Sequence, residues 1–307
     1  MRIANAPCSW GVLEFEGMAP QPYGYAAVLD EIAETGYAGT ELGDWGFMPT
    51  DPAVLADELG QRNLAMLGAF VPVRLRDRAA HAAGRDQAVR TARLLAAVAA
   101  AKSQPGPFVV LADDNGADPV RTANAGSATR EMALDAASLE AFIEGAEEIA
   151  RAVRDATGLP LVFHHHSAGF VETPEELWRF ADATDPDLVG FVFDTGHYCF
   201  NAGPGDPTPD EALERLGGRV RHVHFKDCDP AIAARVRDGG WDYFTAIRRG
   251  VFCELGQGEV DFPAVVRALR QGDYDGWIVV EQDVLPGMGA PRESARRNRE
   301  YLRGLGL

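Results

Sequence analysis

The segment Arg219-Val-Arg-His-Val-His-Phe-Lys-Asp227 alternates polar and apolar side chains along its whole length. Alternation with a period of two predicts a β-strand and places His222, His224 and Lys226 on one face. If that face points into a barrel, His224 lies at the rim and His222 lies one layer deeper, as a supporting hydrogen-bonding group. The segment therefore predicts a strand that delivers polar groups to one end of a sheet.

Short apolar runs of this kind alternate with longer amphipathic segments from one end of the chain to the other. This alternation is typical of strand–helix units around a parallel sheet. Eight strands are expected, beginning near Ile3, Gly39, Leu64, Phe108, Leu161, Val189, Val220 and Ile278. Eight helices are expected near residues 23–35, 51–62, 81–102, 134–156, 262–271 and 291–304 and at the N-cap motifs Thr173-Pro-Glu-Glu176 and Thr208-Pro-Asp-Glu211.

The length and the absence of internal linkers favour one domain. The chain has 307 residues, and a (β/α)₈ barrel typically needs about 250. A doubly wound dinucleotide-binding sheet would carry G-x-G-x-x-G after its first strand, and that motif is absent there. We therefore predict a single (β/α)₈ TIM barrel over residues 1–307.

Composition excludes several classes of partner. The formal charge of −17 disfavours nucleic acid, whose binding depends on Lys and Arg neutralising phosphates. No apolar run approaches the roughly 20 residues that span a bilayer, and the start of the chain lacks the apolar region of a signal peptide. The four cysteines form no C-x-x-C pair, which predicts a cytoplasmic protein. The expected partner is a small molecule, with homo-oligomer formation left open.

Histidines gather where three of the expected strands end. Six of the seven lie between His164 and His224, and barrel enzymes build their active sites at the C-terminal ends of the strands. In Leu161-Val-Phe-His-His-His166, alternation puts His164 and His166 on one face. A short histidine run can also be a solvated strand end. Metal binding is expected here because the neighbouring strands also end in potential ligands.

Two further strands end in carboxylates. Asp194 follows the apolar run Phe191-Val-Phe, with His197 three residues later in an expected short loop, and Glu281 follows Trp277-Ile-Val-Val. An aspartate after a strand can instead be a helix N-cap. Together with His224, these carboxylates would give N and O ligands suited to Mn²⁺, Co²⁺, Zn²⁺ or Mg²⁺.

The Asp194-Thr-Gly-His197 and His224-Phe-Lys-Asp227 segments and the final Glu281 resemble the xylose isomerase-like sugar isomerase/epimerase superfamily. The resemblance spans the whole barrel and implies metal ligands Glu, Asp, His and Glu from strands five to eight. The last three correspond to Asp194, His224 and Glu281. His164 stands where the first glutamate is expected, and we predict it as the fourth ligand.

Within that superfamily, several separate segments resemble the inosose dehydratases of inositol catabolism. They are Asn5-Ala-Pro-Cys-Ser-Trp-Gly11, the His164–His166 run, Arg248-Arg-Gly-Val-Phe252, Gly256-Gln-Gly-Glu-Val-Asp-Phe262 and Gly276-Trp-Ile-Val-Val-Glu-Gln-Asp283. The resemblance implies a hydro-lyase that dehydrates 2-keto-myo-inositol with Mn²⁺ or Co²⁺. Val284 departs from the pattern, which has Pro after Glu-Gln-Asp.

Such a reaction needs a base for the α-proton and an acid for the departing β-hydroxyl. The candidate catalytic residues are His166, His197, Lys226 and Glu281, and Trp10, Glu41 and Gln282 are candidate substrate-binding residues. The alternative is a ketose or sugar-phosphate epimerase or isomerase on the same metal site. The resemblance implies a two-carboxylate design for epimerases, and His164 in place of the first glutamate impairs it. A non-catalytic sugar-binding barrel and a nuclease are weaker alternatives.

Overall fold

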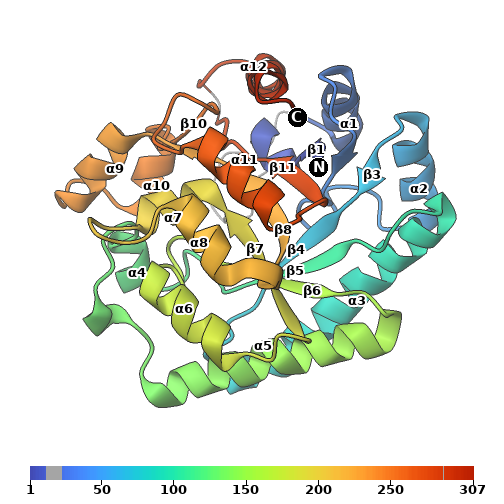
Figure 1. Ribbon diagram of the computed structural model, residues 1–307. Coiled ribbons are helices and arrows are strands. Elements are labelled where there is room, and N and C mark those ends of the chain that lie inside the picture. Colours follow the sequence, from blue (N-terminus) through green and yellow to red (C-terminus); the bar gives the residue numbers. More distant parts are fainter. Residues whose placement is uncertain (12–22, 286) are drawn as a thin grey trace.

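The computed structural model describes residues 1–11, 23–285 and 287–307. Nine strands form one parallel sheet (Figure 1). They are β1 (Arg2–Asn5), β2 (Gly39–Thr40), β3 (Ala65–Met66), β4 (Gly68–Pro72), β5 (Phe108–Ala112), β6 (Leu161–His164), β7 (Val189–Asp194), β8 (Val220–Phe225) and β11 (Trp277–Val280). Two short strands, β9 (Asp227–Cys228) and β10 (Phe252–Cys253), form a separate antiparallel pair.

The strands β3 and β4 at the two ends of the sheet are consecutive in the chain and together form the third strand of the barrel. This arrangement confirms the predicted eight-stranded barrel. β3 pairs with β2 and β4 pairs with β5, and a single residue, Leu67, separates β3 from β4. The two segments are therefore one barrel strand in two parts. In the ladder between β7 and β8, Asp194 lies opposite His224, so the two predicted ligands share one level of the barrel.

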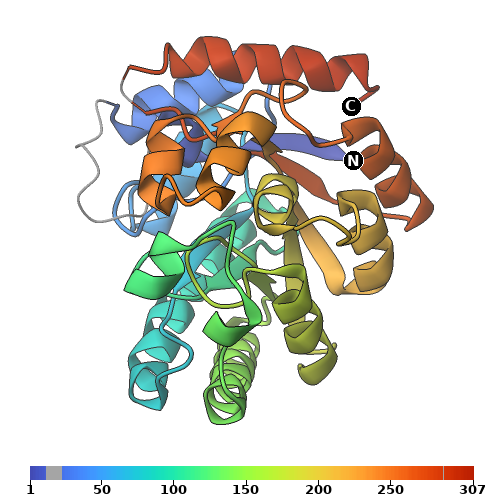
Figure 2. The same ribbon diagram turned by 90° about the vertical axis from the view of Figure 1, so that its left-hand side faces the viewer.

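Helices surround this sheet (Figures 1 and 2). The eight predicted helices are present as α1 (Tyr25–Glu34), α2 (Pro52–Gln61), α3 (Arg78–Lys102), α5 (Ala136–Thr157), α6 (Pro174–Ala183), α8 (Pro209–Leu216), α11 (Phe262–Gln271) and α12 (Pro291–Gly304). Four short helices were not predicted: α4 (Pro119–Ala123), α7 (Thr195–Asn201), α9 (Pro230–Arg237) and α10 (Tyr243–Arg248). No helix in the described ranges is long and apolar enough to cross a membrane.

The short loop expected after Asp194 is wrong, because α7 begins at Thr195 directly after β7. Asp194 is the N-cap of α7 and accepts a hydrogen bond of 2.8 Å from the His197 amide. Such a cap satisfies an N–H group at the first turn of a helix. Asp194 therefore has one carboxylate oxygen in the cap and the other available for the barrel mouth.

The inside of the barrel holds a thin apolar layer below its mouth. Ala4 and Val279 belong to one small buried cluster, and Val110, Val162 and Val192 belong to another. Both are separate from the main cluster, which includes strand residues and the helices around them. His164, Asp194 and Glu281 each follow a member of this layer by two positions, so alternation places them on the inward face.

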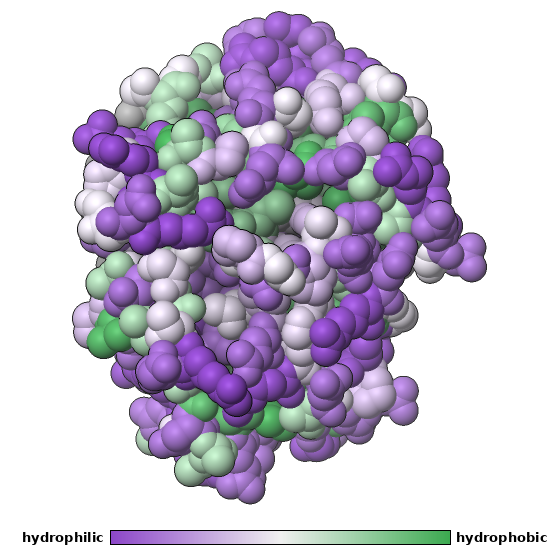
Figure 3. Space-filling model, turned by 60° about the vertical axis from the view of Figure 1, so that its left-hand side comes forward, coloured by the Kyte–Doolittle hydropathy of each residue, from purple (hydrophilic) through white to green (hydrophobic). Residues whose placement is uncertain are grey.

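The outer surface agrees with the acidic composition. Figure 3 shows a largely hydrophilic face, as expected for a formal charge of −17. On the C-terminal side of the barrel, α9 and α10 pack with residues near α4 and after β6 and β7 in a small apolar cluster that includes Ala125, Ala168, Phe200 and Tyr243. This cluster adds a wall to the barrel mouth that the eight-helix prediction lacked.

Candidate metal centre and active site

Four side chains from neighbouring strands converge at the barrel mouth. They are His164 at the end of β6, Asp194 at the end of β7, His224 in β8 and Glu281 just after β11. One potential ligand atom from each lies within 4.8 Å of the others. The structure thus brings together all four residues that the sequence suggested as metal ligands.

The spacing of these atoms fits a divalent ion. His224 Nδ1 is 3.2 Å from His164 Nε2 and 3.2 Å from Glu281 Oε1, and Asp194 Oδ2 is 3.8 Å from both histidine nitrogens. Ligand atoms about 2.1 Å from a tetrahedral ion are about 3.4 Å apart. Asp194 Oδ2 is buried and has no hydrogen-bond partner among the described residues. A bound ion would give this oxygen a partner and would account for the close approach of the two ring nitrogens.

The electrostatics at the cluster suit ligation by His164 and Asp194. The pKa of His224 is raised to about 9, against the effect of burial, by the charges of Glu281 and Glu41, so His224 would lose a proton when it binds an ion. Burial, together with the charges of nearby cations, lowers the pKa of His164 well below its usual range, so its imidazole is neutral. Burial raises the pKa of Asp194, an effect that Lys226 partly offsets. A buried carboxylate with a raised pKa gains most from a nearby positive charge, and neutral imidazole is the form that binds metal.

Glu41, predicted to bind substrate, lies against two histidines of β8. Its Oε1 is 3.0 Å from His224 Nε2 and 2.7 Å from His222 Nε2. Although burial opposes it, the positive charge of His224 lowers the pKa of Glu41 well below its usual range. A carboxylate that accepts the second ring N–H of a ligating histidine fixes its tautomer, and Glu41 thereby directs His224 Nδ1 toward the cluster.

Lys226 forms a buried ion cluster with two acids from the end of β11. Its Nζ is 3.2 Å from Glu281 Oε2 and 3.4 Å from Asp283 Oδ1. Burial alone would lower the pKa of Lys226, but the charges of Asp283 and Glu281 raise it well above the usual range. Lys226 is therefore an ammonium group, which can donate a proton to substrate and is unsuited to removing one.

His166 and His197 stack on each other with ring centroids 3.9 Å apart. His166 Nδ1 is 2.8 Å from the Ser167 carbonyl oxygen, so Nδ1 carries the proton and Nε2 carries the lone pair. Burial lowers the pKa of His166 to about 3. His197 Nδ1 is 2.8 Å from Ser167 Oγ. Of this pair only His166 lines the pocket described next.

The pocket at the mouth has a volume of about 120 Å³. Six predicted site residues line it, namely Glu41, His164, His166, His224, Lys226 and Glu281. The other four predicted site residues, Trp10, Asp194, His197 and Gln282, do not line it. The Trp10 indole donates to Glu31 at 2.6 Å, and the Gln282 Oε1 accepts from Ser294 and Asn298 at 2.9 Å each.

Four polar side chains that sequence reasoning missed also line this pocket: Asp114, Asn115, Tyr243 and Asp283. Asp283 could have been found, because it lies two positions after Glu281 and alternation places it on the same face. Asp114 and Asn115 follow β5 and Tyr243 begins α10, where no pattern in the sequence marks them. The Asn115 side-chain amide has no hydrogen-bond partner among the described residues.

Comparison with known proteins agrees with this architecture. The family model described as "Xylose isomerase-like TIM barrel" matches residues 29–305, and the chain belongs to that family. A protein named inosose dehydratase from Geobacillus kaustophilus (strain HTA426) is 31% identical over 304 residues, covering 98% of this chain and 93% of that protein. Another of the same name from Salmonella agona (strain SL483) is 32% identical over 305 residues, covering 98% and 95%.

Solved structures show the same fold. A protein named IOLI with a bound zinc atom matches with a TM-score of 0.70 at 15% identity, covering 99% of this chain and 98% of that one. The 3-keto-D-glucoside 4-epimerase YcjR from E. coli matches with a TM-score of 0.69 at 17% identity, covering 99% of both chains. At these identities the structural similarity shows that the barrel fold is shared, whereas the reaction depends on the residues of the site.

Proposed function

We propose that this chain is a metal-dependent hydro-lyase that removes water from a keto-polyol, namely 2-keto-myo-inositol, with Mn²⁺ or Co²⁺ favoured over Zn²⁺ or Mg²⁺. The observation that carries the proposal is the four-ligand cluster, three members of which line the same pocket as the charged amine of Lys226. Near full-length identity of 31% to 32% with proteins named inosose dehydratase supports the choice of substrate. Cytoplasmic location and homo-oligomer formation stay predictions from the sequence.

His164, Asp194, His224 and Glu281 would hold the ion. When bound, it would act as a Lewis acid toward the substrate ketone and make the neighbouring C–H acidic. His166 would take that α-proton on Nε2, the ring nitrogen that carries the lone pair. Its pKa, lowered by burial to about 3, keeps the imidazole neutral before the reaction.

Lys226 would supply the acid for the second half of the reaction. The C–O bond to the β-hydroxyl breaks as Lys226 donates a proton, and the hydroxyl leaves as water. The electron pair of the broken C–H bond becomes the new C=C bond of the enolised diketone. Asp283 and Glu281 keep Lys226 protonated between turnovers through their negative charges.

The direct test is to incubate the purified chain, loaded with Mn²⁺, with 2-keto-myo-inositol. Dehydration yields a product lighter by one water in mass spectrometry and an absorbance from the enolised diketone. A product of unchanged mass that is a stereoisomer of the substrate would overturn dehydration and promote the epimerase alternative. Proton exchange with deuterated solvent does not separate the two reactions, because both begin with the same enolate.

A further inference from the structure

The loop between β6 and α6 carries His166 and contains two unusual backbone conformations. Ala168 and Val171 have φ values of 64° and 65°. The left-handed region is disfavoured for residues with a Cβ and is a genuine outlier for β-branched valine. Such conformations persist only where surrounding contacts impose them. The loop conformation therefore depends on side-chain contacts that hold its backbone.

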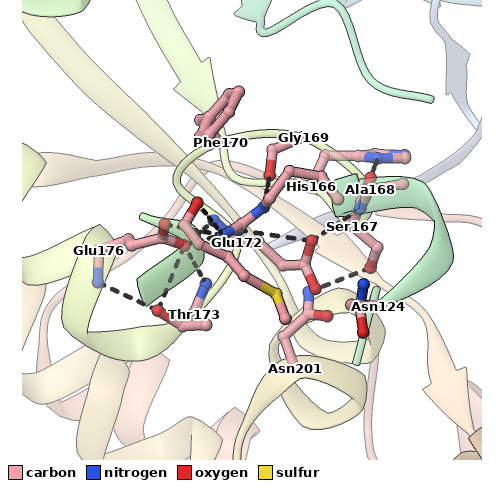
Figure 4. Close-up of polar contacts among 12 residues, drawn as sticks. Asn124, His166, Ser167, Ala168, Gly169, Phe170, Glu172, Thr173, Glu176 and Asn201 are labelled. Carbon is pink, nitrogen blue, oxygen red and sulfur yellow. Dashed lines mark hydrogen bonds and ion pairs between the residues drawn. The ribbon is translucent and has the colours of Figure 1, made fainter. Parts of the chain in front are cut away.

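These contacts come from two buried side chains, Arg121 of α4 and Glu172 of the loop itself, and Figure 4 shows Glu172 among the loop residues. Glu172 Oε2 accepts from the Ala168 amide at 2.9 Å, and its Oε1 accepts from the Gly126 amide at 2.8 Å. Arg121, from α4, donates through Nε to the Gly169 carbonyl at 2.7 Å. The backbones of two successive loop residues, Ala168 and Gly169, are thus hydrogen-bonded to the side chains of Glu172 and Arg121, respectively.

Arg121 and Glu172 belong to a cluster that stability alone does not explain. Arg121 is 1% exposed and Glu172 is 2% exposed, and their closest N–O distance is 3.6 Å. Arg121 also makes a two-pronged ion pair with Glu176, at 3.0 and 2.8 Å. Burial raises the pKa of Glu172 to about 8, against the lowering effect of Arg121. Buried ion pairs often contribute no net stability.

The part of the loop that this cluster fixes leads directly to His166. The Ser167 carbonyl accepts a hydrogen bond from His166 Nδ1–H at 2.8 Å, and Ser167 Oγ contacts His197 Nδ1 at 2.8 Å and Asn201 Nδ2 at 3.0 Å. This carbonyl and the Ala168 N–H, which donates to Glu172, belong to the same planar peptide group. The orientation of that peptide therefore decides which nitrogen of His166 carries the proton.

We propose that Arg121 and Glu172 are positioning residues for His166. They hold the loop in its left-handed conformation, so that the Ser167 carbonyl keeps the proton of His166 on Nδ1 and the lone pair on Nε2. This inference rests on the proposed function in one respect, namely that His166 accepts a proton from the substrate. Neither residue lines the pocket, so both act through the loop.

The first experiment measures kinetics of the metal-loaded full chain. In Arg121→Met and in Glu172→Gln we expect kcat to fall roughly 10- to 100-fold, because small misplacements of a reacting group have effects of this size. KM and bound metal should change by less than about twofold, because no pocket group or ligand is altered. Glu175→Gln is the matched control, since Glu175 is an exposed acid of α6 paired with the exposed Arg130. An unchanged kcat in both buried variants overturns the proposal.

A double variant separates positioning from stability. Arg121→Met leaves the buried carboxylate of Glu176 without its two-pronged partner and should lower Tm. Adding Glu176→Gln removes that charge and should recover part of the lost Tm, whereas kcat should stay low because the Gly169 carbonyl still lacks its donor. If kcat recovers together with Tm, the cluster is structural only and the proposal is wrong.

The final experiment does not depend on turnover. Nitrogen-15 NMR of labelled histidines in the chain loaded with diamagnetic Zn²⁺ reports which ring nitrogen carries the proton, and His166→Gln assigns the signal. We expect the Nδ1–H form in the wild type and a mixture of both forms in Arg121→Met. If the wild type fails to dehydrate 2-keto-myo-inositol, the proposed function fails while this measurement still decides the positioning role. An identical Nδ1–H signal in wild type and variant overturns the inference.

Discussion

The two ends of the barrel differ in a way that volume does not reveal. The hollow at the N-terminal end, lined by residues such as Met66, Phe108 and Trp277, measures about 640 Å³, whereas the pocket at the C-terminal mouth measures about 120 Å³. The smaller one contains the convergent imidazoles, carboxylates and Lys226. Convergence of charged groups, rather than size, therefore marks the end of the barrel where chemistry takes place.

One residue connects the two ends. His222 lines the larger hollow and donates toward Glu41, which lines the smaller pocket. Along β8, a step of two positions from His222 to His224 leads from the supporting layer to the ligand layer. The chemical character of the barrel interior therefore changes over two residues of β8, which is one period of strand alternation.

The largest expected effect comes from removing a ligand at the mouth. His224→Ala and Glu281→Gln should each abolish turnover and bound metal, because each removes one of four converging ligand atoms. Unfolding should remain cooperative, since the packed barrel core is left intact. Elemental analysis and activity measurements check this. Full activity of a chelator-treated protein that contains no metal would contradict the metal centre itself.

Lys226→Met should have the next largest effect. Loss of a general acid typically lowers a rate by roughly 10²- to 10⁴-fold. We expect the variant to exchange the substrate α-proton with deuterated solvent and to release little dehydrated product. Loss of exchange as well would reassign Lys226 to enolate formation or substrate binding.

Glu41→Gln should weaken the metal site without destroying it. Loss of a carboxylate that orients a ligating histidine typically lowers metal affinity about 10- to 100-fold, and Glu41 contacts His224 at 3.0 Å. Titration with the metal measures this. His222→Ala should likewise lower Tm or metal affinity more than it changes the rate at saturating metal. A His222→Ala variant that keeps both properties but stops the reaction would break the layered assignment.

The stability of the chain should also be sensitive to acid. Burial lowers the pKa of His165 to about 3, whereas an unfolded histidine titrates near 6.5. The unfolded state therefore binds the proton first, and stability is lost as the pH falls from about 6.5 toward 3. We expect Tm to decrease over this range and the slope to lessen in His165→Asn. A Tm that stays constant down to pH 5 would argue against buried neutral histidines.

The smallest effect is expected at the other end of the barrel. Trp277→Phe changes a half-buried side chain of the larger hollow and should lower Tm slightly, because some packed apolar surface is lost. The kcat/KM of the variant should stay within about twofold of wild type. A loss comparable to that of Lys226→Met would mean that the N-terminal hollow takes part in the reaction, and the contrast between the two ends would fail.

Much of this architecture was predictable because the relevant patterns are local. The alternation of apolar runs and capped amphipathic segments predicted the eight strands and the eight larger helices. Parallel strands bring their C-terminal ends together, so the sequence alone assigns His164, Asp194, His224 and Glu281 to one mouth of the barrel. The position of a polar residue at the C-terminal end of an apolar strand is therefore enough to place it at the mouth.

The tertiary structure alone decided which partners these side chains have. Glu41 reaches His224 across 183 positions of sequence, and the Gln282 side chain turns away to α12 although its neighbour Glu281 joins the cluster. Arg121 of α4 meets Glu172 in the loop that carries His166. Strand alternation assigns a side chain to a face, but its rotamer and its hydrogen-bond partners depend on groups distant in sequence. The sequence by itself therefore determined the barrel and the end that bears the metal ligands, whereas packing across the barrel determined how each group is oriented.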